Sequence, residues 1–268
     1  MSPLSQLAIT QPQPLIGRGA LVTGVTRRSG IGFAVAARFA QMGARVCVHS
    51  WLPGDTVRTD ESEPGGMDAL LDALHTHGGP AAHVAADLGV PDAPAGVVAA
   101  AMDAVGPLDI LVANHTHHEG PQTLEDLTAA QIDRHLAVNV RGTLLLIQAW
   151  AACHEDDRPG GRVVLFTSGQ HRGPMPQELA YVASKGALHQ LTASLAAHLA
   201  PRRLTVNTID PGPTDTGWPP PEVYEAILKA SPQGRWGQSD DAARVIAWLA
   251  TDDSQWITGQ VIDSRGGL

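Results

Sequence analysis

The chain has 268 residues, of which 43% are hydrophobic and 17% are charged, a composition typical of a folded globular protein rather than a disordered one. Its formal net charge of -9 argues against general binding to nucleic acid or anionic membranes, which requires a broad basic face. The two cysteines, Cys47 and Cys153, lack partners at metal-ligand spacing, which predicts reduced thiols and excludes a disulfide scaffold.

The N-terminal residues 1–17 are predicted to form a polar tail, and residues 18–268 a single domain. No basic start followed by an apolar run is present, so the sequence gives no sign of a secretory signal. The apolar stretches look shorter than the roughly 20 residues of a membrane span. We therefore expect a soluble, cytoplasmic protein that binds neither nucleic acid nor membranes.

Short apolar runs alternate along the chain with segments whose apolar residues recur at helical spacing. Strands are predicted at 20–22, 45–49, 82–86, 108–112, 162–167, 204–209 and 260–262. Helices are predicted at 30–42, 67–77, 93–105, 124–153 and 179–199, with another before the last strand. This regular alternation predicts an α/β fold: one Rossmann-like, doubly wound parallel sheet with helices on both faces.

Residues 211–238 depart from this pattern because they contain six prolines. Prolines break helices and strands, so we expect a loop with one short helix near 222–229. Long loops in compact domains often close over a ligand, which makes this segment a candidate substrate loop, with an irregular surface excursion as the alternative. Trp218 and Trp236 in this loop could form an apolar substrate wall, or could make core or subunit contacts.

A glycine-rich turn follows the first predicted strand, with Gly24, Gly30 and Gly32 in the sequence T-G-V-T-R-R-S-G-I-G. Glycine allows a sharp turn and close ligand approach, and the next helix begins with free N–H groups that favour a phosphate. The spacing differs from the dinucleotide fingerprint G-x-G-x-x-G, so this turn alone is a weak indication.

The second motif is Tyr181-x-x-x-Lys185, in a chain that has only two tyrosines and two lysines. A spacing of four residues on a helix places both side chains on one face. A nearby ammonium favours the phenolate, so we expect Lys185 to lower the pKa of Tyr181 and make it a usable acid or base.

Together these motifs resemble the short-chain dehydrogenase/reductase family, from about residue 19 to residue 268. Ser168 stands 13 residues before Tyr181, as the family's serine does, and Asn139 in V-N-V-R-G matches its asparagine. Asp87, the P-G-P-T-D-T segment at 211–216 and the closing I-T-G-Q-V-I-D at 257–263 match further family segments. The overall look is closest to 3-oxoacyl-acyl-carrier-protein reductases.

The resemblance implies hydride transfer between a nicotinamide and a carbonyl or secondary alcohol. It assigns Ser168 to the substrate oxygen, Tyr181 to proton transfer and Lys185 to the nicotinamide ribose, with Asn139 holding a water in the proton relay. The cofactor-binding residues it implies are Gly24, Thr26, Arg27, Arg28, Ser29, Gly30, Ile31, Gly32, Ser50, Trp51, Asp87, Leu88, Asn114, Tyr181, Lys185, Pro211, Gly212, Thr214 and Thr216. A small-molecule substrate, a homodimer or homotetramer and no metal are also implied.

Two departures concern the cofactor. The first turn is two residues longer than the family's T-G-x-x-x-G-x-G and carries Arg27 and Arg28. The second strand ends His49-Ser50-Trp51, without the acid that would bind the ribose 2′-hydroxyl of NAD. An arginine can meet a 2′-phosphate, so we favour NADP, with NAD as the alternative.

A third departure follows the fourth strand, where the family's N-N-A-G is replaced by Ala113-Asn114-His115-Thr116. The added side chains lie where a cofactor approaches closely, which leaves open a shifted cofactor, weak activity, or a sensor that binds NADP without turnover. An enoyl-reductase-like enzyme is the other alternative, because the long turn resembles that branch. That branch, however, has a wider Tyr-to-Lys spacing and lacks the upstream serine.

His115, His117 and His118 invite a metal-site interpretation, since histidine is a common ligand. No cysteine or second ligand cluster accompanies them in the sequence. We therefore expect surface or pocket-lining residues and predict no metal.

Overall fold

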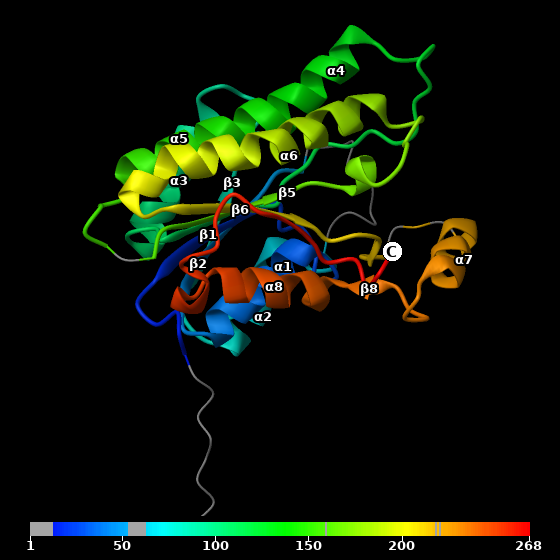
Figure 1. The fold of residues 1–268 in the computed structure, drawn as a ribbon. Coiled ribbons are helices and arrows are strands. Elements are labelled where there is room, and N and C mark those ends of the chain that lie inside the picture. The colour runs from blue at the N-terminus through cyan, green and yellow to red at the C-terminus, as the bar shows by residue number, and fades with distance from the viewer. Residues whose placement is uncertain (1–12, 53–62, 159, 218, 220) are drawn as a thin grey trace, which may run out of the picture.

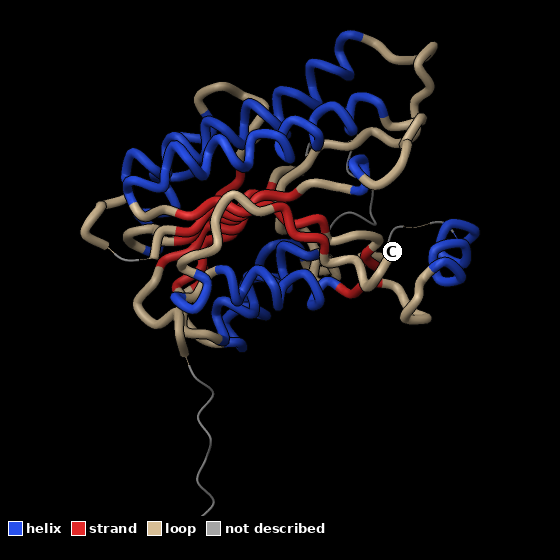
Figure 2. Tube along the Cα trace, viewed as in Figure 1, coloured by secondary structure: helices blue, strands red, loops and turns tan. Residues whose placement is uncertain are grey.

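The computed structural model describes residues 13–52, 63–158, 160–217, 219 and 221–268, and a seven-stranded parallel sheet lies at its centre (Figure 1, Figure 2). The strands are β1 (Gly19–Thr23), β2 (Arg45–Ser50), β3 (Ala81–Ala85), β4 (Ile110–Ala113), β5 (Arg162–Phe166), β6 (Thr205–Asp210) and β9 (Val261–Asp263). Their order is β3-β2-β1-β4-β5-β6-β9. The predicted doubly wound α/β fold is confirmed.

Helices cover both faces of the sheet (Figure 1). One layer holds α1 (Ile31–Gln41), α2 (Gly66–His77) and α8 (Ser239–Leu249). The other holds α3 (Ala93–Val105), α4 (Ala129–His135), α5 (Thr143–Cys153) and α6 (Leu179–Leu199). Each layer has its own apolar core, one around Phe39 and Ile246 and the other around Leu146 and Trp150. Burial of the central strands on both faces explains why they read as continuous apolar runs.

The helix expected at 124–153 begins later and contains an irregularity. A π-helical segment, η2 (Leu136–Gly142), joins α4 to α5. A wider helical turn of this kind depends on tertiary packing and is frequent at functional sites. Asn139, one of the predicted catalytic residues, lies within this segment and is fully buried.

This helical run, Ala129–Cys153, has the length and composition of a membrane span, contrary to the expectation that no apolar stretch is long enough. Its α5 part packs into the core, where Leu146, Ile147 and Trp150 are buried against the layer that contains α3. The core helix of a folded domain meets the same criterion, and we interpret it in that way.

Several predicted site residues lie just beyond the carboxyl ends of the strands. Gly24 follows β1, Asn114 follows β4, Ser168 follows β5 by one residue, and Pro211 follows β6. The strand order reverses between β1 and β4, because β1 pairs with both β2 and β4. Ligands of open α/β sheets bind at the carboxyl edge beside such a reversal. We call this side of the sheet the carboxyl edge.

The proline-rich loop contains a two-stranded sheet of β7 (Thr214–Asp215) and β8 (Gly237–Gln238), and the helix α7 (Pro221–Ala230). The short helix expected near 222–229 is therefore confirmed. Trp236 is buried, stacks on the Tyr224 ring at 5.1 Å and donates through Nε1 to the Tyr224 carbonyl at 2.9 Å. Trp236 thus packs within the loop, whereas Trp218 lies outside the described residues.

Three short 3-10 helices complete the described elements: η3 (Gly169–His171), η4 (Ala200–Arg202) and η5 (Asp252–Ser254). Most of the predicted N-terminal tail, residues 1–12, lies outside the described residues. Leu15 is fully buried, and its N–H donates to the Met42 carbonyl at 3.0 Å. The last residues before β1 thus contact the core.

Candidate active site

Tyr181 and Lys185 lie one turn apart near the start of α6. The Lys185 ammonium is buried, lies 5.7 Å from the centroid of the Tyr181 ring and donates to the Phe166 carbonyl at 3.3 Å. The helical spacing therefore brings the two side chains together as predicted. An ammonium has three donors, so this single described hydrogen bond leaves capacity for a ligand.

Burial dominates the protonation of this pair. Burial raises the pKa of Tyr181 to about 12, although a hydrogen bond with Ser168 acts in the opposite direction. Burial also lowers the pKa of Lys185 to about 8. The expectation of a lowered tyrosine pKa is thus corrected, because desolvation of the phenolate dominates. The phenol is protonated at neutral pH and can act as a proton donor.

Ser168 precedes η3 and is separated from the end of β5 by Thr167, and neighbouring side chains contact its backbone. Its N–H donates to Oε1 of Gln170 at 3.1 Å, and Nε2 of Gln170 donates to the Thr167 hydroxyl at 2.7 Å. That hydroxyl donates to the Lys185 carbonyl at 3.2 Å. The serine loop is therefore tied to the helix that carries Tyr181 and Lys185.

Asn139 reaches the same helix from η2. Its Nδ2 donates to the Ser184 hydroxyl at 2.9 Å and to the His117 carbonyl at 3.1 Å, and its Oδ1 accepts from the His117 N–H at 2.6 Å. The Ser184 hydroxyl donates to the Tyr181 carbonyl at 2.7 Å. The amide of Asn139 is thus engaged with protein groups, so its observed contacts join η2 to α6. Sequence reasoning missed Ser184, although it stands inside the Tyr181–Lys185 motif.

The glycine-rich turn packs against the end of β4. Gly24 has a φ of +73°, and a Cβ there would lie 2.7 Å from Cα of His115. A Cβ on Gly32 would lie 2.8 Å from Nδ2 of Asn114, which donates to the carbonyls of Thr23 and Gly24 at 3.0 Å. These two glycines are therefore required by close protein packing, and Asn114 holds the turn in place.

The donors at the carboxyl edge fit a nicotinamide dinucleotide. Helix α1 begins after Gly30, and no side chain in the described part of the protein caps that N-terminus. Its first N–H groups are available to a phosphate, as at other anion-binding helix starts. The Lys185 ammonium makes one described hydrogen bond, so its other N–H groups can donate to ribose hydroxyls. Gly30, Ile31 and Gly32 would hold the phosphates, and Lys185 the nicotinamide ribose.

The residues expected near a 2′-phosphate already have partners within the protein. The Arg28 guanidinium pairs with Glu63 at 3.0 Å and also donates to the Ala69 carbonyl at 3.2 Å. Ser50 hydrogen-bonds His83 at 2.9 Å, whereas the Trp51 side chain is largely exposed. A phosphate approaching Arg28 would therefore compete with the Glu63 carboxylate.

Asp87 links two loops rather than standing free. Its carboxylate accepts from the Gly89 N–H at 2.8 Å and from Arg134 at 3.0 Å. The next residue, Leu88, is buried in the core beside α3. These contacts fix the loop after β3, which is where an adenine-contacting residue is expected.

The segment after β6 meets the first turn. The Ser29 hydroxyl donates to the Thr216 carbonyl at 3.0 Å. The Thr214 hydroxyl donates to the Gly212 carbonyl at 3.1 Å, and the Gly212 N–H donates to Asp210 at 2.9 Å. The structure thus brings the P-G-P-T-D-T segment and the glycine-rich turn side by side.

The three histidines after β4 behave differently from one another. His115 is buried, which corrects the expectation of a surface or pocket-lining residue. Its Nδ1 lies 2.7 Å from the Thr23 hydroxyl and its Nε2 lies 3.3 Å from the Val138 carbonyl, while burial lowers its pKa to about 3. A neutral His115 therefore bridges β1 and η2 in place of the family's small residue.

His117 and His118 remain near the surface. His117 pairs with Glu119 at 2.8 Å. The His118 ring meets the Tyr181 ring edge-on at 5.1 Å, and its Nε2 lies 3.8 Å from Glu178. His118 is thus a neighbour of the predicted proton donor that sequence reasoning did not assign to the site.

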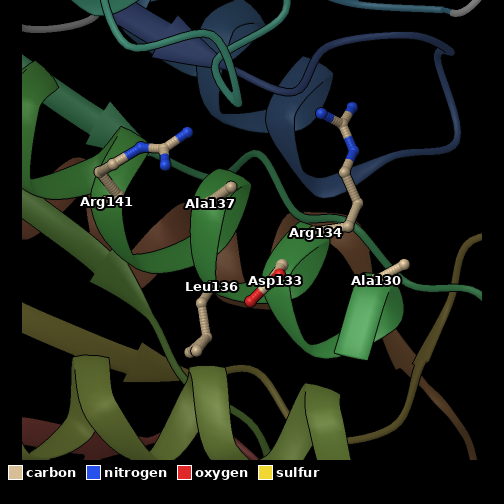
Figure 3. A pocket seen from close by; sticks show the side chains of 6 residues that line it. All are labelled: Ala130, Asp133, Arg134, Leu136, Ala137 and Arg141. Carbon is tan, nitrogen blue, oxygen red and sulfur yellow. The ribbon is translucent and has the colours of Figure 1, made fainter. Parts of the chain in front are cut away.

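A hollow on the outer side of α4 and η2 is lined by Ala130, Asp133, Arg134, Leu136, Ala137 and Arg141 (Figure 3). Arg134 is engaged with Asp87, and Arg141 donates to the Gly89 carbonyl. None of the six is among the predicted site residues.

Comparison with known proteins agrees with this arrangement. A family model described as Enoyl-(Acyl carrier protein) reductase matches residues 24–268. The chain is 36% identical over 252 residues to the uncharacterized oxidoreductase YjdA of Bacillus subtilis, covering 93% of this chain and 96% of that protein.

Two solved structures are similar in both fold and sequence. One is LugOII, a promiscuous reductase that catalyses keto-reduction at C1 during lugdunomycin biosynthesis, with a TM-score of 0.82, 38% identity and coverage of 95% and 98% of the two chains. The other is the angucycline C-6 ketoreductase LanV with bound NADP, with a TM-score of 0.82, 34% identity and coverage of 95% and 96%. With these matches and this site, the chain belongs to the short-chain dehydrogenase/reductase family and is an oxidoreductase.

Proposed function

We propose that the protein reduces a ketone or aldehyde with NADPH, and oxidises the corresponding alcohol in reverse. The observation that carries this proposal is the set of contacts around Tyr181. The Tyr181 phenol is protonated, interacts with Ser168 and lies beside a buried ammonium. The backbone carbonyl of Tyr181 accepts from the Ser184 hydroxyl, which in turn accepts from Asn139. A site of this kind suits a reaction in which negative charge develops on a carbonyl oxygen.

The proposed roles follow from that charge. A bound nicotinamide supplies the hydride. The Ser168 hydroxyl donates a hydrogen bond to the substrate oxygen, and Tyr181 gives that oxygen a proton as the carbon receives the hydride. Lys185 stabilises the phenolate left behind and holds the ribose hydroxyls. Asn139 fixes η2 against α6, and the water relay implied by the family resemblance would pass behind Lys185.

The preference for NADP rests on the charge near the first turn. No acid ends β2, where Ser50 is followed by the exposed Trp51, and Arg28 lies on the neighbouring turn. The NADP bound in the LanV structure supports the same choice. A carboxylate at that place would repel the 2′-phosphate, whereas a guanidinium attracts it.

A panel of ketones and aldehydes assayed with NADPH and NADH tests the proposal. Turnover of at least one carbonyl compound, with a lower KM for NADPH than for NADH, is expected. Tight NADPH binding without turnover across the panel would instead indicate a sensor.

Two acyl thioesters belong in that panel. A 3-oxoacyl thioester tests the 3-oxoacyl reductase activity. The net charge of -9 disfavours this substrate when it is attached to an acidic carrier protein, which would need a basic docking surface. A 2-enoyl thioester tests enoyl reduction, which the long first turn and the matched family description favour. The four-residue spacing of Tyr181 and Lys185 and the presence of Ser168 favour carbonyl reduction over it.

We further propose a homodimer or homotetramer in the cytoplasm. The long helices expose faces that a second copy could cover, including Leu136 on η2. Light scattering at micromolar concentration measures the oligomeric state directly, and a monomer would contradict this part of the proposal.

A further inference from the structure

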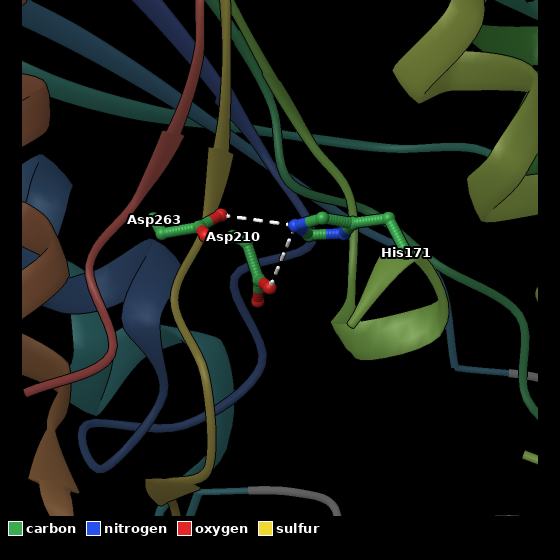
Figure 4. A group of neighbouring side chains, drawn as sticks. All are labelled: His171, Asp210 and Asp263. Carbon is green, nitrogen blue, oxygen red and sulfur yellow. Dashed lines mark hydrogen bonds and ion pairs between the residues drawn. The ribbon is translucent and has the colours of Figure 1, made fainter. Parts of the chain in front are cut away.

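His171 joins the loop of Ser168 to the C-terminal strand. Its Nδ1 lies 3.0 Å from the Ser168 carbonyl oxygen, and its Nε2 lies 3.1 Å from Oδ1 of Asp263 on β9. The same Nε2 lies 4.0 Å from Oδ2 of Asp210, at the end of β6. Figure 4 shows the imidazole between the η3 loop and the ends of the two strands.

Both short contacts of the ring are made to hydrogen-bond acceptors. A backbone carbonyl and an ionised carboxylate can only accept, so the ring is the donor of any hydrogen bond in either contact. The Ser168 N–H is held independently by Gln170. Both backbone polar groups of Ser168 are thus fixed by side chains, and the carbonyl is fixed through a ring that is itself anchored to β9.

The group formed by His171, Asp210 and Asp263 has the residue types of a metal site, with ligand atoms within 4.8 Å of one another. Each carboxylate, however, has its own guanidinium: Arg172 donates to Asp263 at 3.0 Å and Arg265 to Asp210 at 2.8 Å. Each carboxylate thus already has a guanidinium partner, so the chemistry is that of an ion-pair network.

The last residues of the chain strengthen this link. Arg172 also donates to the Leu268 carbonyl at 3.2 Å. A Cβ on Gly169 would lie 3.1 Å from NH1 of Arg265, and one on Gly212 would lie 2.8 Å from Cγ of the same side chain. Arg265 therefore lies against both the turn after Ser168 and the turn after β6. The C-terminal segment contacts two loops of the site from one side.

We propose that His171 and Arg172 are positioning residues that use the C-terminal segment 263–268 as a fixed support for the Ser168 loop. The inference rests on the proposed function, because it concerns where the Ser168 hydroxyl stands relative to Tyr181. Loss of the support lets the loop shift, and small displacements of a catalytic group reduce the rate without weakening binding elsewhere.

A double-mutant cycle tests the coupling. His171→Ala, Asp263→Ala and the double variant are assayed with NADPH and the best ketone, well below each variant's unfolding midpoint. Each single change is expected to lower kcat about fivefold to tenfold with an unchanged KM for NADPH, and the double variant to be no worse than the singles. Arg172→Ala is also expected to lower kcat, although it leaves the His171 imidazole in place. The exposed Arg244, paired with Asp240 on α8, gives a matched control, because Arg244→Ala removes an ion pair far in sequence from this loop.

Wild-type kcat in the single variants, multiplicative losses in the double variant, or the same loss in Arg244→Ala would overturn the positioning role. Ser168→Ala distinguishes a failure of the proposed function from a failure of the positioning role. If Ser168→Ala keeps full activity, the proposed function fails. If Ser168→Ala is inactive while His171→Ala and Arg172→Ala match wild type, the positioning proposal alone fails.

Discussion

The two sides of the carboxyl edge are built differently. On the β5–α6 side, buried polar groups are bonded to one another: Asn139 donates to the Ser184 hydroxyl, and the Thr167 hydroxyl donates to the backbone carbonyl of Lys185. On the β1–β2 side, Arg28 and Trp51 are exposed, and Arg28 is held by the Glu63 carboxylate and the Ala69 carbonyl. The groups proposed to react are thus fixed by the interior, whereas the residues proposed to select the cofactor are exposed charges, where a substitution disturbs little of the packing.

The largest effect is expected on the buried side, from Tyr181→Phe. Removing the proton donor should lower kcat roughly 100-fold or more, the usual worth of general acid catalysis. Steady-state kinetics with NADPH and a responsive ketone measure it. Tyr224→Phe, which keeps the ring stacked on Trp236, is the matched control and should retain near-wild-type kcat. Near-wild-type turnover by Tyr181→Phe would remove the assignment.

The second prediction compares the two lysines. Lys185→Arg preserves charge but places a larger, planar group in a buried site, and should lower kcat about tenfold or more. Lys229→Arg on α7 should be nearly silent. Equal effects of the two changes on kcat would show that the buried site accepts either cation, and would contradict a specific role for Lys185.

On the exposed side, Arg28→Ala is expected to raise the KM for NADPH about fivefold and leave the KM for NADH unchanged, since one charge-assisted contact is lost after competition with Glu63. Glu63→Gln frees the same guanidinium and should lower the KM for NADPH. If both variants shift the two cofactors equally, Arg28 does not read the 2′-phosphate.

The smallest effect concerns pH and stability. The folded-state pKa of Lys185, about 8, lies below its ordinary value of 10.5, so between these values the unfolded chain binds more protons than the folded one. Lys185 therefore makes stability rise with pH across that window. Urea unfolding of wild type and Lys185→Met at pH 7 and pH 10 should show wild type gaining relative to the variant. Lys229→Met supplies the background, and a gap independent of pH would contradict the buried ammonium.

Much of this architecture could be predicted from the sequence because local patterns determine it. The helix expected at 179–199 is observed with those bounds. The short helix in the proline-rich loop lies between Pro221 and Pro232, where no proline interrupts it. The motif spacing also placed Tyr181, Lys185 and Ser168 together, because the carboxyl ends of parallel strands share one edge.

What the sequence could not show depends on packing. The π-helical segment around Asn139 arises from contacts with α6 and the loop of His117, which no local pattern encodes. The sequence predicts a surface or pocket-lining position for His115, because its burial follows from contacts with Gly24 and Thr23, which are distant in the chain. The raised pKa of Tyr181 was mispredicted for a related reason, since helical spacing reveals the nearby cation but not the loss of water.

The scarcity of lysine has a practical consequence for handling the protein. Lys185 is buried and Lys229 is exposed on α7, so apart from the chain's amino terminus an amine-directed reagent finds one accessible side chain. A fluorophore or resin coupled through amines would therefore attach beside the proline-rich loop. An immobilised preparation would present a nearly uniform orientation, and a dye at that position would report directly on movements of α7.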